Sequence, residues 1–113
     1  MASQHKTSKV LDFESRQRER RAEKYVLRLY IAGATPRSTR AVANIREICE
    51  HKLNGRYDLE VIDIYQHPAL AQGEQIIAAP TLVKQLPHPL RRFIGDLSDT
   101  ERILVGMDLA AAS

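Results

Sequence analysis

Apolar and polar positions alternate along the chain in a way that predicts strands and helices in turn. The run YVLRLYIA, from Tyr25 to Ala32, is almost continuously apolar and rich in β-branched and aromatic residues, as in a strand buried on both faces. Gly33 and Pro36 end this strand, and Thr35 can cap a helix that has Pro36 at its first position. Apolar residues then recur at helical spacing at Val42, Ile45, Cys49 and Leu53.

A second strand is predicted from Leu59 to Tyr65, where the sequence reads LEVIDIY. Together with the preceding strand and helix it forms a crossover unit, in which the two strands are almost always parallel. A short helical segment then begins at His67-Pro68, is weakened by Gly73 and stops before Pro80.

The region after this short helix contains three of the five prolines, Pro80, Pro87 and Pro89. Alternating apolar positions on either side of the Pro-His-Pro corner predict two short strands: Leu82 and Leu86, then Leu90 and Ile94. An X-Pro bond adopts the cis form at a cost of only about 0.5–1 kcal/mol. Three such bonds can therefore support more than one backbone path.

The closing segment, RILVGMDL from Arg102 to Leu109, carries two conflicting signals. A capping box, in which Ser98 accepts from the Glu101 amide, predicts a final helix. Three bulky apolar residues in a row before Gly106 indicate a buried strand equally well. We therefore expect Gly106 and Asp108 to hold the balance between two folds. Replacing Gly106 by Ala should favour the helix by about 1 kcal/mol, and Asp108→Arg should add about 0.3–1 kcal/mol at its C-terminal end.

Length and charge limit the fold and its partners. The 113 residues suffice for one domain, and the net charge of +3 comes from the first 24 residues, where seven Lys and Arg outnumber four Asp and Glu. The remainder is neutral, so the domain lacks the basic stripe that nucleic acid requires. No apolar run approaches the roughly 20 residues that cross a bilayer, and a cytoplasmic location is expected. We expect residues 1–24 to form a charged, mobile extension, 25–109 the domain and 110–113 a short tail.

The predicted order, βαβ followed by αββα, is that of a single thioredoxin-like α/β domain. Pro80 falls where such folds keep a cis-proline facing their active site. A redox enzyme would carry a thiolate at the start of the first helix, but the chain offers Ala34, Thr35 and Ser38 there. Cys49, the single cysteine, lies on the apolar stripe of the helix and is expected to fill the core. Thiol-disulfide exchange is therefore not expected.

Other catalytic and ligand-binding signals are also weak. Four histidines lack the i, i+3 or i, i+4 spacing of a helical metal site, and neither GxxxxGK[ST] nor GxGxxG occurs. Asp63 stands inside an apolar strand, where a paired strand-end residue is a simpler interpretation than an acid or base. We expect no cofactor, no metal and no enzymatic activity.

Four ordered motifs carry a resemblance to a known family: YVLRLYIAGATPRSTRAV, LEVIDIYQHPALA, IIAAPTLVKQLPHPLRRFIGDLS and ILVGMDL. From Tyr25 to Leu109 the chain resembles the KaiB family of the cyanobacterial circadian clock. The resemblance implies a non-enzymatic regulator with two folds, and we expect Pro80, Pro87 and Pro89 to take part in the change between them. A self-associated ground state (βαββααβ, a tetramer or dimer) differs in its C-terminal half from a rarer thioredoxin-like monomer, which binds the N-terminal ATPase ring of a KaiC-like hexamer.

The resemblance also suggests where partners bind. We expect the ring to contact the second strand and the helix after it, with Asp58, Glu60 and Gln75 at the contact. Members of the family often carry a lysine at the position of Gln75. Arg40 and Arg92 are candidates for a further partner, KaiA or a SasA-like histidine kinase.

Three alternatives stay open at this point. The chain can serve an hourglass timer or a stress response instead of a self-sustained oscillator, because KaiA is often missing outside the cyanobacteria. It can be a KaiB-like sensor or adaptor module in stress signalling. A thioredoxin-like redox or glutathione-dependent enzyme that uses the face around Pro80 is the competing enzymatic interpretation.

Overall fold

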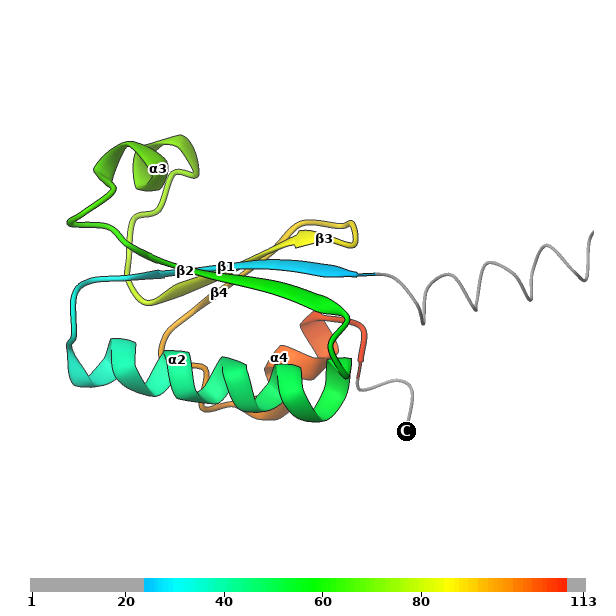
Figure 1. Ribbon diagram of the computed structural model, residues 1–113. Coiled ribbons are helices and arrows are strands. Elements are labelled where there is room, and N and C mark those ends of the chain that lie inside the picture. The colour runs from blue at the N-terminus through cyan, green and yellow to red at the C-terminus, as the bar shows by residue number, and fades with distance from the viewer. Residues whose placement is uncertain (1–23, 110–113) are drawn as a thin grey trace, which may run out of the picture.

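A computed structural model describes residues 24–109. Its centre is a four-stranded sheet in the order β2-β1-β3-β4 (Figure 1). The strands are β1 (Tyr25–Ile31), β2 (Tyr57–Asp63), β3 (Thr81–Leu86) and β4 (Arg91–Ile94). β1 pairs in parallel with β2 and antiparallel with β3, and β3 pairs antiparallel with β4. The expected extension, apart from Lys24, and the tail at 110–113 lie outside the described residues.

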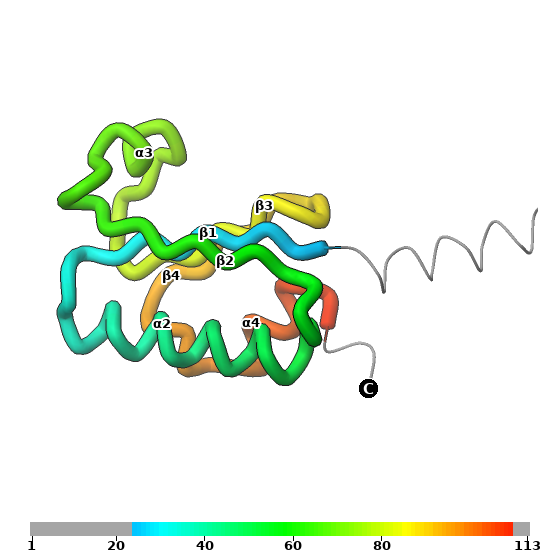
Figure 2. Tube along the Cα trace, viewed as in Figure 1, coloured from blue at the N-terminus to red at the C-terminus, as the bar shows by residue number. Residues whose placement is uncertain are grey.

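The helices cover the two sides of the sheet unequally. They are α2 (Pro36–Ile48), which continues as the π-helical turn η1 (Cys49–Leu53), α3 (Pro68–Gly73) and α4 (Thr100–Gly106). Figures 1 and 2 show α2 and α4 on one side of the sheet and the short α3 above one end of the other side. The predicted order βαβ then αββα is thus confirmed, and the ambiguous closing segment is a helix in this structure.

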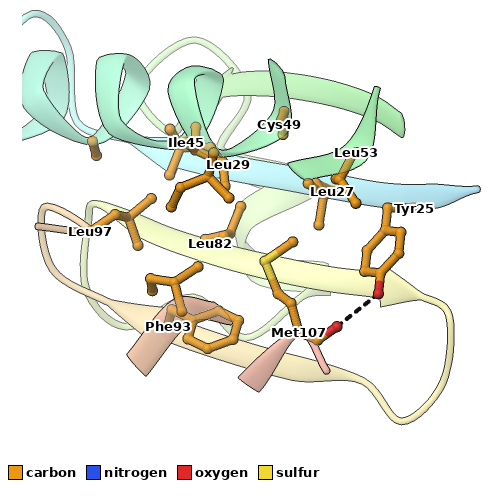
Figure 3. Close-up of a cluster of buried hydrophobic side chains, with 13 residues drawn as sticks. Tyr25, Leu27, Leu29, Ile45, Cys49, Leu53, Leu82, Phe93, Leu97 and Met107 are labelled. Atoms are coloured by element: carbon orange, nitrogen blue, oxygen red, sulfur yellow. Dashed lines mark hydrogen bonds between the residues drawn. The ribbon is translucent and has the colours of Figure 1, made fainter. Parts of the chain in front are cut away.

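The main core lies between the sheet and the pair α2 and α4. β1 contributes Tyr25, Leu27 and Leu29, which alternate along the strand and face the helices (Figure 3). The helices and the other strands complete this core with Ala41, Ile45, Ile48, Cys49, Leu53, Leu82, Phe93, Leu97, Ile103 and Met107. The Tyr25 hydroxyl donates to the Met107 carbonyl at 2.7 Å, which ties the start of β1 to the end of α4.

A smaller apolar cluster occupies the other side of the sheet, under α3. It contains Tyr30, Ile62, Ala71 and Val83. Only Ala71 is buried among the residues of α3, so this helix covers a small part of the sheet. The remainder of this side has no helix over it among residues 24–109.

Local capping confirms one sequence prediction and corrects another. Thr35 caps α2, because its hydroxyl accepts from the Ser38 amide at 3.2 Å with Pro36 at the first helical position. The prediction of a capping box at Ser98 is wrong. Asp99 caps α4 instead, and its carboxylate accepts from the Arg102 amide at 3.2 Å.

Strand boundaries also differ from the prediction at β2. The strand begins and ends two residues earlier than expected, at Tyr57 and Asp63. It ends at Asp63 because the chain turns there, and the side chain oxygen of Asp63 accepts from the Tyr65 amide at 2.9 Å.

The residues proposed to govern a change of fold have distinct surroundings. The peptide bonds before Pro80, Pro87 and Pro89 are cis. Gly106 packs against the ring of Phe93, and a methyl group there would come within 2.5 Å of the Phe93 Cζ. The prediction based on helix propensity alone is therefore incomplete at Gly106, since the buried ring of Phe93 must also move. Asp108 adopts a left-handed conformation with φ of 59° just after α4.

Candidate partner-binding surface

A row of paired residues crosses the four strands on the side of the sheet that α3 covers only in part, and it is polar on β2, β1 and β4. The register pairs Glu60 of β2 with Arg28 of β1, Arg28 with Val83 of β3, and Val83 with Arg92 of β4. Directly paired residues of neighbouring strands project to the same face. Arg28 lies between the core residues Leu27 and Leu29, so its side chain points away from α2. We call this side of the sheet, outside α3, the open face.

One carboxylate lies close to both basic residues of this row. Glu74, at the end of α3, lies 3.9 Å from a guanidinium nitrogen of Arg28 and 3.9 Å from one of Arg92. Gln85 of β3 donates to the same carboxylate at 2.7 Å. The shortest contact of Glu74 in this group is thus the hydrogen bond from the uncharged amide of Gln85, while both ion pairs are long.

Two more of the predicted contact residues border this group. The carboxylate of Asp58 on β2 lies 3.1 Å from the ammonium of Lys24, with both side chains mostly exposed. The backbone carbonyl of Gln75 accepts from Arg92 at 3.4 Å, and the Gln75 side chain is exposed. The structure therefore brings Asp58, Glu60, Gln75 and Arg92 to one face.

A shallow depression and two exposed apolar side chains lie beside this polar group. A depression of about 300 Å³ runs between β1 and β2 and is lined by Val26, Leu27, Arg28, Asp58, Leu59 and Glu60. Ile94 of β4 projects to the same face two residues after Arg92 and is 56% exposed, and Ile77, after Gln75, is 92% exposed. Large apolar side chains beside a charged row are typical of protein interaction sites.

Arg40 does not belong to this surface. It lies on α2, across the sheet from Arg28, and its guanidinium donates to the Asp96 carboxylate at 3.3 Å. Asp96 also accepts from the Ser98 amide at 3.1 Å. Hydrogen bonds from Ser98, and secondarily the Arg40 guanidinium, lower the pKa of the Asp96 carboxyl below its ordinary value.

The loop after β1 is held by structural hydrogen bonds. The Asp63 carboxylate accepts from the Gly33 amide at 3.3 Å in addition to the Tyr65 amide. The Ser38 hydroxyl accepts from the Ala32 amide at 3.3 Å. These contacts agree with the interpretation of Asp63 as a paired strand-end residue. They also show that polar groups of this loop hold the start of α2 in place.

Cys49 lacks the properties of a redox nucleophile. Its side chain is fully buried in the main core. Burial, together with the negative charge of Glu50, raises the pKa of the Cys49 thiol to about 12. A thiol of this kind stays protonated at neutral pH, and this favours the expected role in the core over thiol-disulfide exchange.

Three residues of the open face were missed from the sequence: Arg28, Glu74 and Gln85. A signal for Arg28 was present, because it is a charged residue at an alternating position inside the otherwise apolar run YVLRLYI. Glu74 and Gln85 gave no such signal, since their proximity depends on how α3 folds back over β3. Among residues 24–109, no helix is long and apolar enough to span a membrane.

The amino-acid sequence is similar to those of a known protein family. The KaiB domain family model matches residues 28–109. The circadian clock oscillator protein KaiB of Prochlorococcus marinus (strain MIT 9313) is 54% identical over 85 residues, which are 75% of this chain and 71% of that protein.

Solved structures support the fold. The N-terminal domain of SasA from Synechococcus elongatus gives a TM-score of 0.62 at 22% identity, over 75% of this chain and 84% of that chain. Mitochondrial thioredoxin 3 from Saccharomyces cerevisiae also gives 0.62, at 16% identity, over 77% and 80%. The predicted thioredoxin-like α/β fold is thus confirmed.

Proposed function

Because the chain belongs to the KaiB family, we propose that it is a non-enzymatic regulator of a circadian or hourglass timing system and binds the N-terminal ATPase ring of a KaiC-like hexamer. The family supports a role in a clock. The observation that supports this mode of action is the open face, where four of the five predicted partner-binding residues gather beside exposed Ile77 and Ile94.

In this proposal the ring contacts β2, the helix α3 that follows it, and the residues directly after α3. Asp58 and Glu60 alternate with residues that pack against the main core, so both side chains point outward from the edge strand β2. Gln75 follows α3 with an exposed side chain. Arg40 lies on the other side of the molecule, where a further partner such as KaiA or a SasA-like kinase can bind at the same time as the ring. Arg92, the other candidate for that partner, lies on the open face and belongs to the ring contact in this proposal.

A change of fold accompanies binding in this proposal. The free protein rests in a self-associated state, a dimer or tetramer, in which the C-terminal half of the domain is rearranged. The ring captures the thioredoxin-like monomer and so shifts the population. The conflicting strand and helix signals between Arg102 and Leu109 support this idea, because most natural segments agree with a single structure.

Charge reversal at Glu60 tests the ring contact. Glu60→Lys should weaken binding of the KaiC-like protein from the same genome, measured by co-elution with ATP over several incubation times. Glu47→Lys is the matched control, because Glu47 is an exposed carboxylate on α2, on the other side of the sheet. Equal binding by the Glu60 variant and the natural chain would remove the open face as the contact.

A further inference from the structure

We infer that Arg28, Arg92 and Gln85 form a receptor for an acidic side chain of the partner protein, and that Glu74 occupies this receptor in the free monomer. The inference rests on the proposed function and specifies the chemistry of the same face. It assigns to the partner an aspartate or glutamate that replaces the carboxylate of Glu74 in the complex.

The receptor is built from three adjacent strands of the sheet. Arg28 comes from β1, Gln85 from β3 and Arg92 from β4, and the carboxylate of Glu74 meets all three. The side chains of Arg28 and Arg92 are 34% and 38% exposed, so both are half-buried against the sheet and still reachable from outside. A planar guanidinium is well suited to bind a carboxylate with two parallel hydrogen bonds.

Glu74 makes incomplete use of this site. Its two contacts with guanidinium groups measure 3.9 Å each, longer than the 2.7–2.9 Å typical of a charge-assisted hydrogen bond. Arg92 makes a further long bond, of 3.4 Å, to the Gln75 carbonyl. The two arginines therefore keep hydrogen-bonding capacity that a second carboxylate, approaching from outside, can use.

The position of Glu74 allows it to leave. It is the residue that follows the last turn of α3, a helix of six residues in which only Ala71 is buried. The next residue, Gln75, has a positive φ of 56° and an exposed side chain, and the chain then runs through Ile76 and Ile77 to Pro80. Ala71 and the partly buried Ile76 are the residues of this segment that pack against the apolar cluster under α3. The segment is therefore anchored by few apolar contacts and can move away from β3 and β4 at lower cost than an element of the main core.

Charge complementarity selects an acidic occupant. Once Glu74 leaves, two guanidinium groups and one amide face the same point, and a positively charged side chain would be repelled there. A basic occupant would have to bind Glu74 itself, so the two possibilities predict opposite effects of removing the charge of Glu74.

The test is the affinity of the ring complex, measured as the dissociation constant for the KaiC-like protein with ATP. Glu74→Gln should tighten binding about fivefold, because the internal competitor is lost. Arg28→Gln should weaken binding about fivefold, and the double variant should lose the gain made by Glu74→Gln. Glu74→Gln also removes contacts that hold this fold together, so a tighter complex would not arise from a more stable free monomer.

Glu47→Gln on α2 is the control for net charge, and it should leave the affinity unchanged. Unchanged or weaker binding by Glu74→Gln would overturn the receptor, and so would an equal gain from Glu47→Gln. If the natural chain does not bind the ring at all, the proposed function fails and the receptor fails with it. If the natural chain binds the ring and neither Glu74→Gln nor Arg28→Gln changes the affinity, the receptor alone is overturned.

Discussion

Gly106 and Phe93 illustrate how one contact can change the expected effect of a substitution. Helix propensity alone favours Ala over Gly by about 1 kcal/mol within a helix. At Gly106, however, a methyl group would meet the ring of Phe93, which is only 5% exposed. Overpacking of a buried site typically costs about 1–3 kcal/mol, so the gain in propensity and the displacement of the ring oppose each other.

We therefore predict an energetic coupling between these two residues. Gly106→Ala should raise the free energy of unfolding by about 1 kcal/mol more in a Phe93→Leu background than in the natural chain. Denaturant unfolding of the four proteins in a double-mutant cycle measures this difference. Gly73→Ala is the control, since nothing lies within 4 Å of a methyl at Gly73 and its effect should not depend on Phe93. Equal effects of Gly106→Ala in both backgrounds would contradict the coupling.

At the scale of residues, the sequence predicted which single residues are buried or cap a helix better than it predicted which residues contact one another. The burial of Cys49 followed from its place on an apolar stripe, and the cap at Thr35 followed from Pro36 beside it. The contact of Gly106 with Phe93 joins α4 to β4, and it depends on how the helix lies on the sheet. The Glu74 group depends in the same way on a fold-back of α3, which local propensity does not determine.

At the scale of elements, Asp96 links α2 to the loop between β4 and α4. Its carboxylate accepts from Arg40 at 3.3 Å, and its backbone carbonyl accepts from the Asn44 side chain at 2.8 Å. Hydrogen bonds from Ser98 and the neighbouring Arg40 lower its pKa below the ordinary value of 3.8. The charged form of Asp96 is therefore favoured in the folded protein.

This shift predicts a pH dependence. A carboxyl whose pKa is lowered by folding contributes stability that is complete above the unfolded pKa and disappears as the pH falls through the lower, folded pKa. Asp96→Asn should thus be less stable than the natural chain near neutral pH, and the difference should shrink as the pH falls below about 4. Urea unfolding at several pH values measures it. A difference that is the same at all pH values would show that the Asp96 charge plays no part.

The elements themselves were largely predictable, because each follows from a strong periodic or capping signal. The predicted bounds of β1 and α2 are close to the observed ones. The predicted bounds of β2, which pairs in parallel with β1, are displaced by two residues. The C-terminal end of β2 was missed because the chain turns at Asp63, whose side chain accepts a hydrogen bond from the Tyr65 amide. The closing segment could not be assigned, since the apolar row before Gly106 fits both a helix and a strand.

At the scale of the whole molecule, the proposed change of fold depends on how α4 ends. Asp108 donates its amide to the Val105 carbonyl at 3.1 Å, and Leu109 donates to the Leu104 carbonyl at 2.8 Å. This is the Schellman pattern, in which the residue at the left-handed position is usually glycine. Asp108 occupies that position with φ of 59°. The dipole argument for Asp108→Arg is therefore incomplete, because an Arg side chain keeps the steric cost of the left-handed backbone.

Asp108→Gly is the sharper test of the proposed balance between folds. Glycine removes the cost of the left-handed conformation, about 1 kcal/mol, and is a poor residue for a strand, so the helix-ended form should gain about fivefold in population. Size-exclusion chromatography should then show less oligomer, and binding to the KaiC-like ring should be faster. Asn54→Gly is the matched control: Asn54 is also left-handed, with φ of 46°, but it ends η1 in the half of the domain that the proposal leaves unchanged. It should raise stability without moving the oligomer fraction. If both variants shift the oligomer equally, or Asp108→Gly shifts neither the oligomer nor the binding rate, the end of α4 does not control the change of fold.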